Sequence, residues 1–234
     1  MQRSDGTLWA RTAVNAEDAS MQLALELERA ATGGEPVTRL HIWLGASLCR
    51  PVRLPVLPGT LSASELRRVG EASAIAQAGL PPPCQVWLDA PDATGRLAVV
   101  IQQRTLDAIE ALGKRVHARV VSIRPLWAQV LTQALLDRPA LEVMAVWEGG
   151  VLTLMAGAGE AITVARTTLQ VNDAASAKAA FLRASIAEGV GKDASLAIAL
   201  DLQRAPTDPS VDNDSSCLRA LPFSAWMSSL EAVA

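Results

Sequence analysis

The sequence predicts an α/β fold in which strands and helices alternate along the chain. Apolar residues recur with helical spacing in some stretches and form short alternating or β-branched runs in others. Clusters of Pro, Gly and Asp separate these stretches, as turns do between packed elements. Half of the 234 residues are hydrophobic, which is enough to build the core of one large domain or two small ones.

The composition argues against several classes of function. The net charge is −3 and the basic residues are scattered, so the chain lacks the basic surface that nucleic acid or an anionic membrane requires. No stretch approaches the roughly 20 apolar residues that span a bilayer. Residues 1–13 lack the apolar centre of a signal peptide. We therefore expect a soluble, cytoplasmic protein.

Three cysteines, Cys49, Cys84 and Cys217, lie far apart in the sequence. Their odd number and wide spacing do not indicate a disulfide framework. No CxxC pair is present, which argues against a zinc site. Cys49 and Cys84 are expected to be small buried thiols.

The first 58 residues predict, in order, a strand, a helix and two strands. The helix is expected to begin after its N-cap, Asn15, and to end at Gly33. The last of the strands contains or precedes three prolines, so it is expected at the edge of a sheet. The predicted ranges are 15–31 for the helix and 7–14, 39–44 and 50–57 for the strands.

A helix, a hairpin, a second helix and a strand follow. Ser62 and Glu65 form a capping-box pattern at the start of the first helix, and the prolines 81–83 end it. Turn-forming residues 89–95 join the two apolar strands of the hairpin. The predicted ranges are 62–78 and 105–114 for the helices and 85–88, 96–101 and 116–123 for the strands.

The second half predicts a helix, a three-stranded meander, another helix and a last strand. The first helix is expected to begin at Arg124-Pro125 and to end before Pro139. Residues 148–150 and 157–160 are expected to be the tight turns of the meander. The predicted ranges are 141–147, 151–156, 161–169 and 194–202 for the strands and 173–188 for the later helix.

The composition changes after Arg204. Residues 205–216 are polar and acidic, which is typical of a linker. An apolar tail follows, in which Trp226, Met227 and Leu230 would share one face of a helix. Such a helix either docks on its own domain or binds a partner as a tethered segment. We favour docking, because terminal segments usually dock or fray.

No complete set of residues for a known chemistry is found. His41 and His117 fall in predicted strands, without a carboxylate or thiol at metal-ligand spacing. There is no GxSxG elbow and no P-loop, and Gly157-Ala158-Gly159 lacks the rest of a dinucleotide fingerprint. We therefore expect no catalytic residue, no metal and no cofactor. The carboxylates fall mostly in predicted turns, where solvation accounts for them: Asp89, Asp92, Glu142, Glu148 and Glu160.

Arg124 lies at the predicted end of a strand, just before Pro125 and near Trp127. Ligands of open α/β sheets bind at the carboxyl ends of strands, which allows a binding role for Arg124. A packed surface contact between the arginine and the tryptophan explains the same pattern, and we favour it.

Three segments have a distinctive order along residues 37–203, with a helix, a hairpin and a second helix between the last two. They are His41-Ile42-Trp43-Leu44-Gly45, Val52-Arg53-Leu54-Pro55 and Val120-Val121-Ser122-Ile123-Arg124-Pro125. This order of elements resembles that of the actin-like cytoplasmic proteins of bacterial envelope machines. These are the PilM protein of type IV pilus assembly and the cytoplasmic domain of GspL in type II secretion.

The resemblance implies an actin-like (ribonuclease H-like) fold, with two mixed sheets flanked by helices. It implies a first subdomain at residues 1–125, a second at 126–204, and a linker and apolar tail at 205–234. In active members of the group the first turn of the meander touches nucleotide phosphate. Here that turn is Trp147-Glu148-Gly149-Gly150 instead of an Asp-Ile-Gly type of turn, and Glu148 would repel a phosphate.

The predicted function is that of a non-catalytic cytoplasmic scaffold in a type IV pilus or type II secretion-like inner-membrane assembly. The resemblance implies that it binds the cytoplasmic tail of a single-span membrane partner in a groove between subdomains, and that it can associate with itself. Strand 50–57 is a candidate sheet edge for such binding. One alternative is an actin-like ATP-binding protein or ATPase. Another is a binding module that acts through its C-terminal tail.

Overall fold

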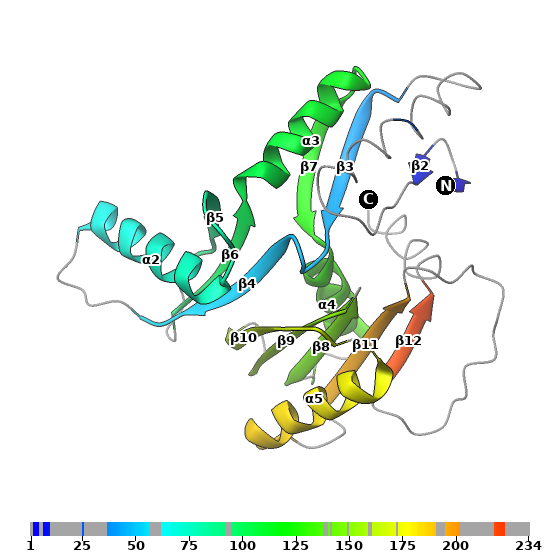
Figure 1. Ribbon diagram of the computed structural model, residues 1–234. Coiled ribbons are helices and arrows are strands. Elements are labelled where there is room, and N and C mark those ends of the chain that lie inside the picture. The colour runs from blue at the N-terminus through cyan, green and yellow to red at the C-terminus, as the bar shows by residue number, and fades with distance from the viewer. Residues whose placement is uncertain are drawn as a thin grey trace.

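Figure 1 shows a computed structural model of the protein, in which helices and strands alternate as predicted. The strands of the described residues form four sheets, of five, three, two and two strands. None of the described helices is both long and apolar enough to cross a bilayer. The structure describes residues 2–4, 7–9, 25, 37–56, 62–91, 95–137, 140, 142–148, 150–158, 161–171, 173–190, 195–201 and 218–222.

A five-stranded mixed sheet occupies the lower part of Figure 1, in the order β10-β9-β8-β11-β12. The first three strands form the predicted antiparallel meander, while β11 runs parallel to β8 and β12 runs parallel to β11. The helix α5 provides the crossover that parallel strands require. The elements are β8 (Val143–Glu148), β9 (Val151–Ala158), β10 (Ala161–Leu169), α5 (Ala174–Ala187), β11 (Ser195–Asp201) and β12 (Leu218–Pro222).

β8 lies in the middle of this sheet and is buried on both faces. Val143 and Ala145 belong to the core cluster that contains Phe181 of α5. Met144 and Val146 point to the opposite face and join a second cluster. Burial on both faces explains why the strand is a continuous apolar run rather than an alternating one.

β12 corrects the expectation for the C-terminal tail. Residues 218–222, which we expected to lie in an apolar tail suited to a helix, form a strand that pairs with β11. The polar stretch before them therefore lies, in the sequence, between two neighbouring strands of one sheet. The helical face predicted for Trp226, Met227 and Leu230 lies outside the described residues.

The first half contains a parallel pair of strands, β3 (Arg39–Leu44) and β7 (Arg119–Pro125), with α3 (Gln103–Arg115) packed against β7. The structure corrects the predicted start of β7. The His117 amide bonds to a helix carbonyl, and His117 has a φ of 54°. His117 therefore lies in the turn that ends α3 and not in a strand.

Between β3 and α3 the chain forms a unit of three strands and one helix, which projects at the left of Figure 1. The strands are antiparallel, in the order β4-β6-β5, and α2 packs on one face of their sheet. We call this the β4–β6 unit. Its elements are β4 (Cys49–Leu54), α2 (Ala63–Ala78), β5 (Cys84–Leu88) and β6 (Arg96–Gln102).

α2 begins and ends where the sequence indicates. The Glu65 amide donates to the Ser62 side chain at 3.4 Å, and the Ser62 amide donates to the Glu65 carboxylate at 2.9 Å, so the predicted capping box is confirmed. Gly79 ends the helix with a φ of 61°, a conformation that glycine adopts without steric cost.

One core cluster joins the two halves of the chain. The helix α4 (Leu126–Asp137) packs against β7 and β8. Its Trp127 is fully buried in a cluster with Leu44 and Ile101 from the first half and Met144 from the second. The subdomain boundary predicted after residue 125 falls at the start of this helix and stays a prediction.

Two short strands, β1 (Gln2–Ser4) and β2 (Thr7–Trp9), form an antiparallel hairpin. β2 covers the start of the strand predicted at residues 7–14. The rest of that strand, and nearly all of the helix predicted to follow Asn15, lie outside the described residues.

Ala74→Leu tests how closely α2 packs on its sheet. Gly70, Ala74 and Ala78 are buried along one side of the helix, and Ala74 is 0% exposed. A larger side chain must push the helix away from the sheet, so we expect a loss of roughly 1–3 kcal/mol in the free energy of unfolding, measured with urea. Ala76→Leu, at an exposed position of the same helix, is the control and should change stability by less than about 0.5 kcal/mol. Equal losses in both variants would contradict this packing.

Candidate functional site

The β3–β4 turn and the end of β8 meet at a buried junction between the two halves of the chain. The turn closes with amide hydrogen bonds of 2.9 and 3.1 Å to the Gly45 carbonyl. Its Ala46 amide donates a hydrogen bond of 2.8 Å to Oε1 of Glu148, the last residue of β8. We call the following residues the junction: Gly45, Ala46, Cys49, Trp127 and Glu148.

Glu148 is only 4% exposed, and its Oε2 has no hydrogen-bond partner within the described part of the chain. A Cβ atom at Gly45 would lie 3.2 Å from that oxygen. Burial raises the pKa of Glu148 from 4.5 to about 7, although the hydrogen bond from Ala46 opposes the shift.

The prediction of a solvated turn carboxylate at Glu148 is wrong. Glu148 pairs with Val151, so β8 extends one residue beyond the predicted strand end. Strand alternation then places its side chain on the same inward face as Met144 and Val146.

Cys49 and Trp127 complete the junction. The Cys49 thiol donates to the Leu44 carbonyl at 3.3 Å, and the Trp127 indole N–H donates to the Cys49 carbonyl at 3.2 Å. Burial, and secondly the nearby Glu148 carboxylate, raise the pKa of the Cys49 thiol, which keeps it protonated and unreactive. The expected buried thiol is therefore confirmed for Cys49, whereas Cys84 is only half-buried.

The junction is poorly suited to a nucleotide phosphate. Phosphate is held by free backbone amides or basic side chains, and the Ala46 amide is already bonded to Glu148. An ionised Glu148 adds negative charge at the same place. Trp147 is also engaged, because its indole N–H donates to the Val171 carbonyl at 2.7 Å. Among the described residues, no group of His, Cys, Asp and Glu is placed to hold a metal ion.

The other residues singled out in the sequence lie apart from the junction. His41 is exposed, and its Nδ1 lies 2.9 Å from the Ser122 hydroxyl on the neighbouring strand. Arg124 is exposed near the end of β7, and its register partner is Trp43 of β3 rather than Trp127. Asp89 follows the end of β5 and is exposed, as predicted, and its side chain accepts a hydrogen bond from the Ala90 amide at 2.8 Å.

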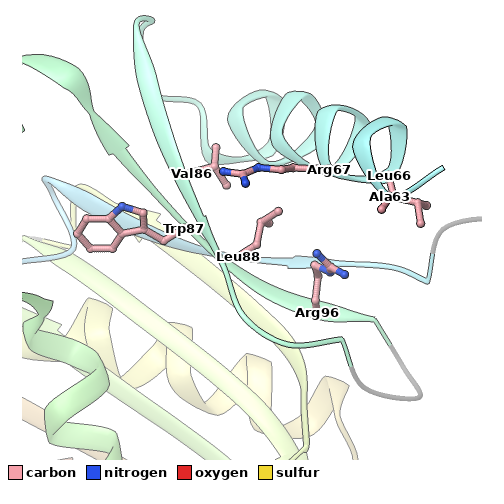
Figure 2. Close-up of a pocket in the computed structure, with 7 residues that line it drawn as sticks. All are labelled: Ala63, Leu66, Arg67, Val86, Trp87, Leu88 and Arg96. Carbon is pink, nitrogen blue, oxygen red and sulfur yellow. The ribbon is translucent and has the colours of Figure 1, made fainter. Parts of the chain in front are cut away.

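A groove that the sequence did not indicate lies on the β4–β6 unit. It has a volume of about 570 Å³ and runs between the first turns of α2 and strand β5 (Figure 2). Its leucine and valine side chains are half-buried. Trp87 points away from α2 in Figure 2 and packs into the core on the other face of the sheet. The lining residues are Ala63, Leu66, Arg67, Val86, Trp87, Leu88 and Arg96.

No protein-family model and no curated protein matches the sequence. Among solved structures, the chain is similar to a protein from Bacteroides thetaiotaomicron with an actin-like ATPase fold and unknown function. The TM-score is 0.51 at 8% identity, and the match covers 90% of this chain and 81% of the other. The predicted actin-like fold is therefore confirmed.

Two further solved structures are similar to this chain. One is the cytoplasmic domain of EpsL, an inner membrane component of the type II secretion system of Vibrio cholerae, with a TM-score of 0.49, 12% identity, and coverage of 92% of this chain and 80% of the other. The other is the PilM–PilN type IV pilus biogenesis complex, with a TM-score of 0.45, 16% identity, and coverage of 79% and 56%.

Glu148→Gln tests whether the buried carboxyl group makes stability depend on pH. The pKa of Glu148 is about 7 in the folded chain against 4.5 ordinarily, so the folded state keeps a proton that the unfolded state releases. Its contribution to stability is therefore full below about pH 4.5 and is lost as the pH rises through about 7, by about 3 kcal/mol in total. Glutamine does not titrate.

The measurement is thermal unfolding at pH 5 and pH 8. The melting midpoint of the wild type should fall by roughly 5–10 °C more than that of Glu148→Gln between these pH values. Glu142→Gln, at an exposed carboxylate next to β8, should follow the wild type. Parallel pH profiles for the wild type and Glu148→Gln would show that the junction does not titrate in this range.

Proposed function

We propose that the chain is a non-catalytic scaffold component of a type IV pilus or type II secretion-like assembly, on the cytoplasmic side of the inner membrane. In this role it binds the cytoplasmic tail of a single-span membrane protein. The order of elements, which resembles that of PilM and of the cytoplasmic domain of GspL, supports the proposal. The actin-like fold is consistent with it.

The hydrogen bond between Ala46 and Glu148 is the main observation that supports a chain without ATPase activity. An actin-like ATPase holds nucleotide phosphate at the first turn of the second-half meander. Here the residue that enters this turn folds its carboxyl group inward and bonds to the first half at 2.8 Å. A contact within the chain thus replaces the ligand contact of an ATPase.

Partner binding through a sheet edge needs free backbone groups. The candidate edge at residues 50–57 corresponds to β4, which does lie at one end of its sheet. However, β10 packs beside β4, and Pro51 in the middle of the strand has no amide N–H to offer. β4 is therefore a poorer edge for a partner than the sequence suggested.

Calorimetric titration with ATP and Mg²⁺ separates the scaffold from the ATPase. We expect no heat of binding up to about 1 mM nucleotide, which corresponds to an affinity weaker than about −4 kcal/mol. The reason is that the Ala46 amide is occupied and Glu148 repels phosphate. Binding in the micromolar range would contradict the non-catalytic role and favour the actin-like ATPase.

Partner capture tests the scaffold role directly. The probe is the cytoplasmic tail of a single-span membrane protein encoded beside this chain, immobilised as a synthetic peptide. We expect the full chain to bind it, and a chain ending after Pro222 to bind it equally well, because that truncation keeps β12. Loss of binding in the truncated chain would favour a module that acts through its C-terminal tail. The absence of a bound tail would count against the scaffold role.

A further inference from the structure

The outer edge of β5 is open in the described part of the chain. β5 ends the sheet order β4-β6-β5, and no described strand pairs with its outer side. The Asp89 amide bonds to the Leu97 carbonyl and the Gln103 amide bonds to the Pro83 carbonyl, both at 2.9 Å. Along an antiparallel pair of strands, hydrogen-bonded and non-hydrogen-bonded residue pairs alternate. The odd-numbered residues of β5 therefore direct their backbone N–H and C=O groups toward β6. The N–H and C=O groups of Val86 and Leu88 therefore point outward.

The same two residues line the groove. Val86 and Leu88 are half-buried and lie, with Leu66 of α2, along its apolar part. Figure 2 shows Leu66 and Ala63 on the first turns of the helix above the sheet. A strand added beside β5 would thus pair with outward backbone groups while every second side chain entered the groove.

The groove carries positive charge. Arg96 lines it and has no ion pair or hydrogen bond with any residue that the structure describes. Arg67 also lines it, and its Nε bonds to Glu71 at 2.8 Å. The side chain of Arg67 remains 72% exposed, so its other donors face solvent. Opposite charge on a ligand would complement both arginines.

We propose that an extended, acidic and aliphatic segment of the membrane partner's tail binds as a fourth strand beside β5, with aliphatic side chains in the groove and carboxylates at Arg96 and Arg67. This assignment rests on the proposed partner-binding role and names the surface at which the partner would bind. It places the binding surface within the β4–β6 unit and away from the junction between the two halves. The prolines 81–83 precede β5 and lack amide N–H groups, so the added pairing does not extend beyond the start of β5.

The test is fluorescence anisotropy with the full chain and a labelled nine-residue peptide, Asp-Glu-Val-Thr-Val-Thr-Val-Glu-Asp. We expect saturable binding that weakens at high salt, because the contacts to arginine are partly exposed. Arg96→Gln should weaken binding about tenfold, as expected for one charge-assisted hydrogen bond. Ala63→Trp should abolish binding by filling the groove from an exposed position of α2.

Matched controls separate strand pairing from simple charge attraction. Arg68→Gln removes an exposed cation on α2 that does not line the groove, so it should leave binding unchanged. A peptide with lysine in place of its acids, and a peptide methylated at its amide nitrogens, should both fail to bind. Equal binding of the methylated peptide, no binding of the acidic peptide, or binding that survives both Arg96→Gln and Ala63→Trp would overturn the proposal.

The proposal would also be wrong if the groove binds the chain's own tail or a second copy of the chain. A peptide of residues 223–234 that binds more tightly than the acidic probe, and loses binding in Ala63→Trp, would assign the groove to the chain's own tail. Self-association that disappears in Ala63→Trp, measured by light scattering, would assign it to a second copy. If the partner tail is captured equally well by the wild type and Ala63→Trp, the scaffold role stands and only this surface is wrong.

Discussion

The hydrogen bond from the Ala46 amide to Glu148 connects parts of the chain that are 102 residues apart in sequence. It forms only if β8 continues to residue 148 and if the β3–β4 turn presents the Ala46 amide toward that strand. Gly45 leaves room for the carboxyl group, since a Cβ there would approach Oε2 to 3.2 Å. The Trp127 indole fixes the other side of the turn through the Cys49 carbonyl. This polar contact lies inside the apolar cluster that joins the two halves, and it adds one specific link to that packing.

Burying the charged form of a carboxyl group costs free energy, because the group loses hydration that one hydrogen bond replaces only in part. The raised pKa of Glu148 reflects this cost. Near neutral pH both the neutral and the charged form of Glu148 are populated, and the apolar surroundings destabilise the charged form. The buried carboxyl group of Glu148 thus makes the junction sensitive to protonation.

The β4–β6 unit has a different physical character. Its helix lies close to the sheet where Gly70, Ala74 and Ala78 are buried, and the groove opens where Ala63 and Leu66 precede this stripe of small residues. The unit thus combines a firmly packed end with an open one. Among the described residues, the open edge of β5, the apolar groove and an arginine without an ion pair, Arg96, occur together at the open end.

The sequence by itself determined the local structure of this protein. The capping box of Ser62 and Glu65, the proline break after α2 and the apolar run of β8 are signals that neighbouring residues carry, so the order of elements could be predicted from them. The actin-like fold was predicted from the resemblance of that order to a known group of proteins.

Only the tertiary structure decided which side chains meet. Whether Glu148 is solvated or buried depends on where β8 ends and what packs on its inward face, and no local pattern specifies either. The pairing of β12 with β11 and the opening beside β5 likewise follow from contacts between segments that are distant in the chain. Such contacts depend on the packing of whole elements, so single-residue propensities do not reveal them.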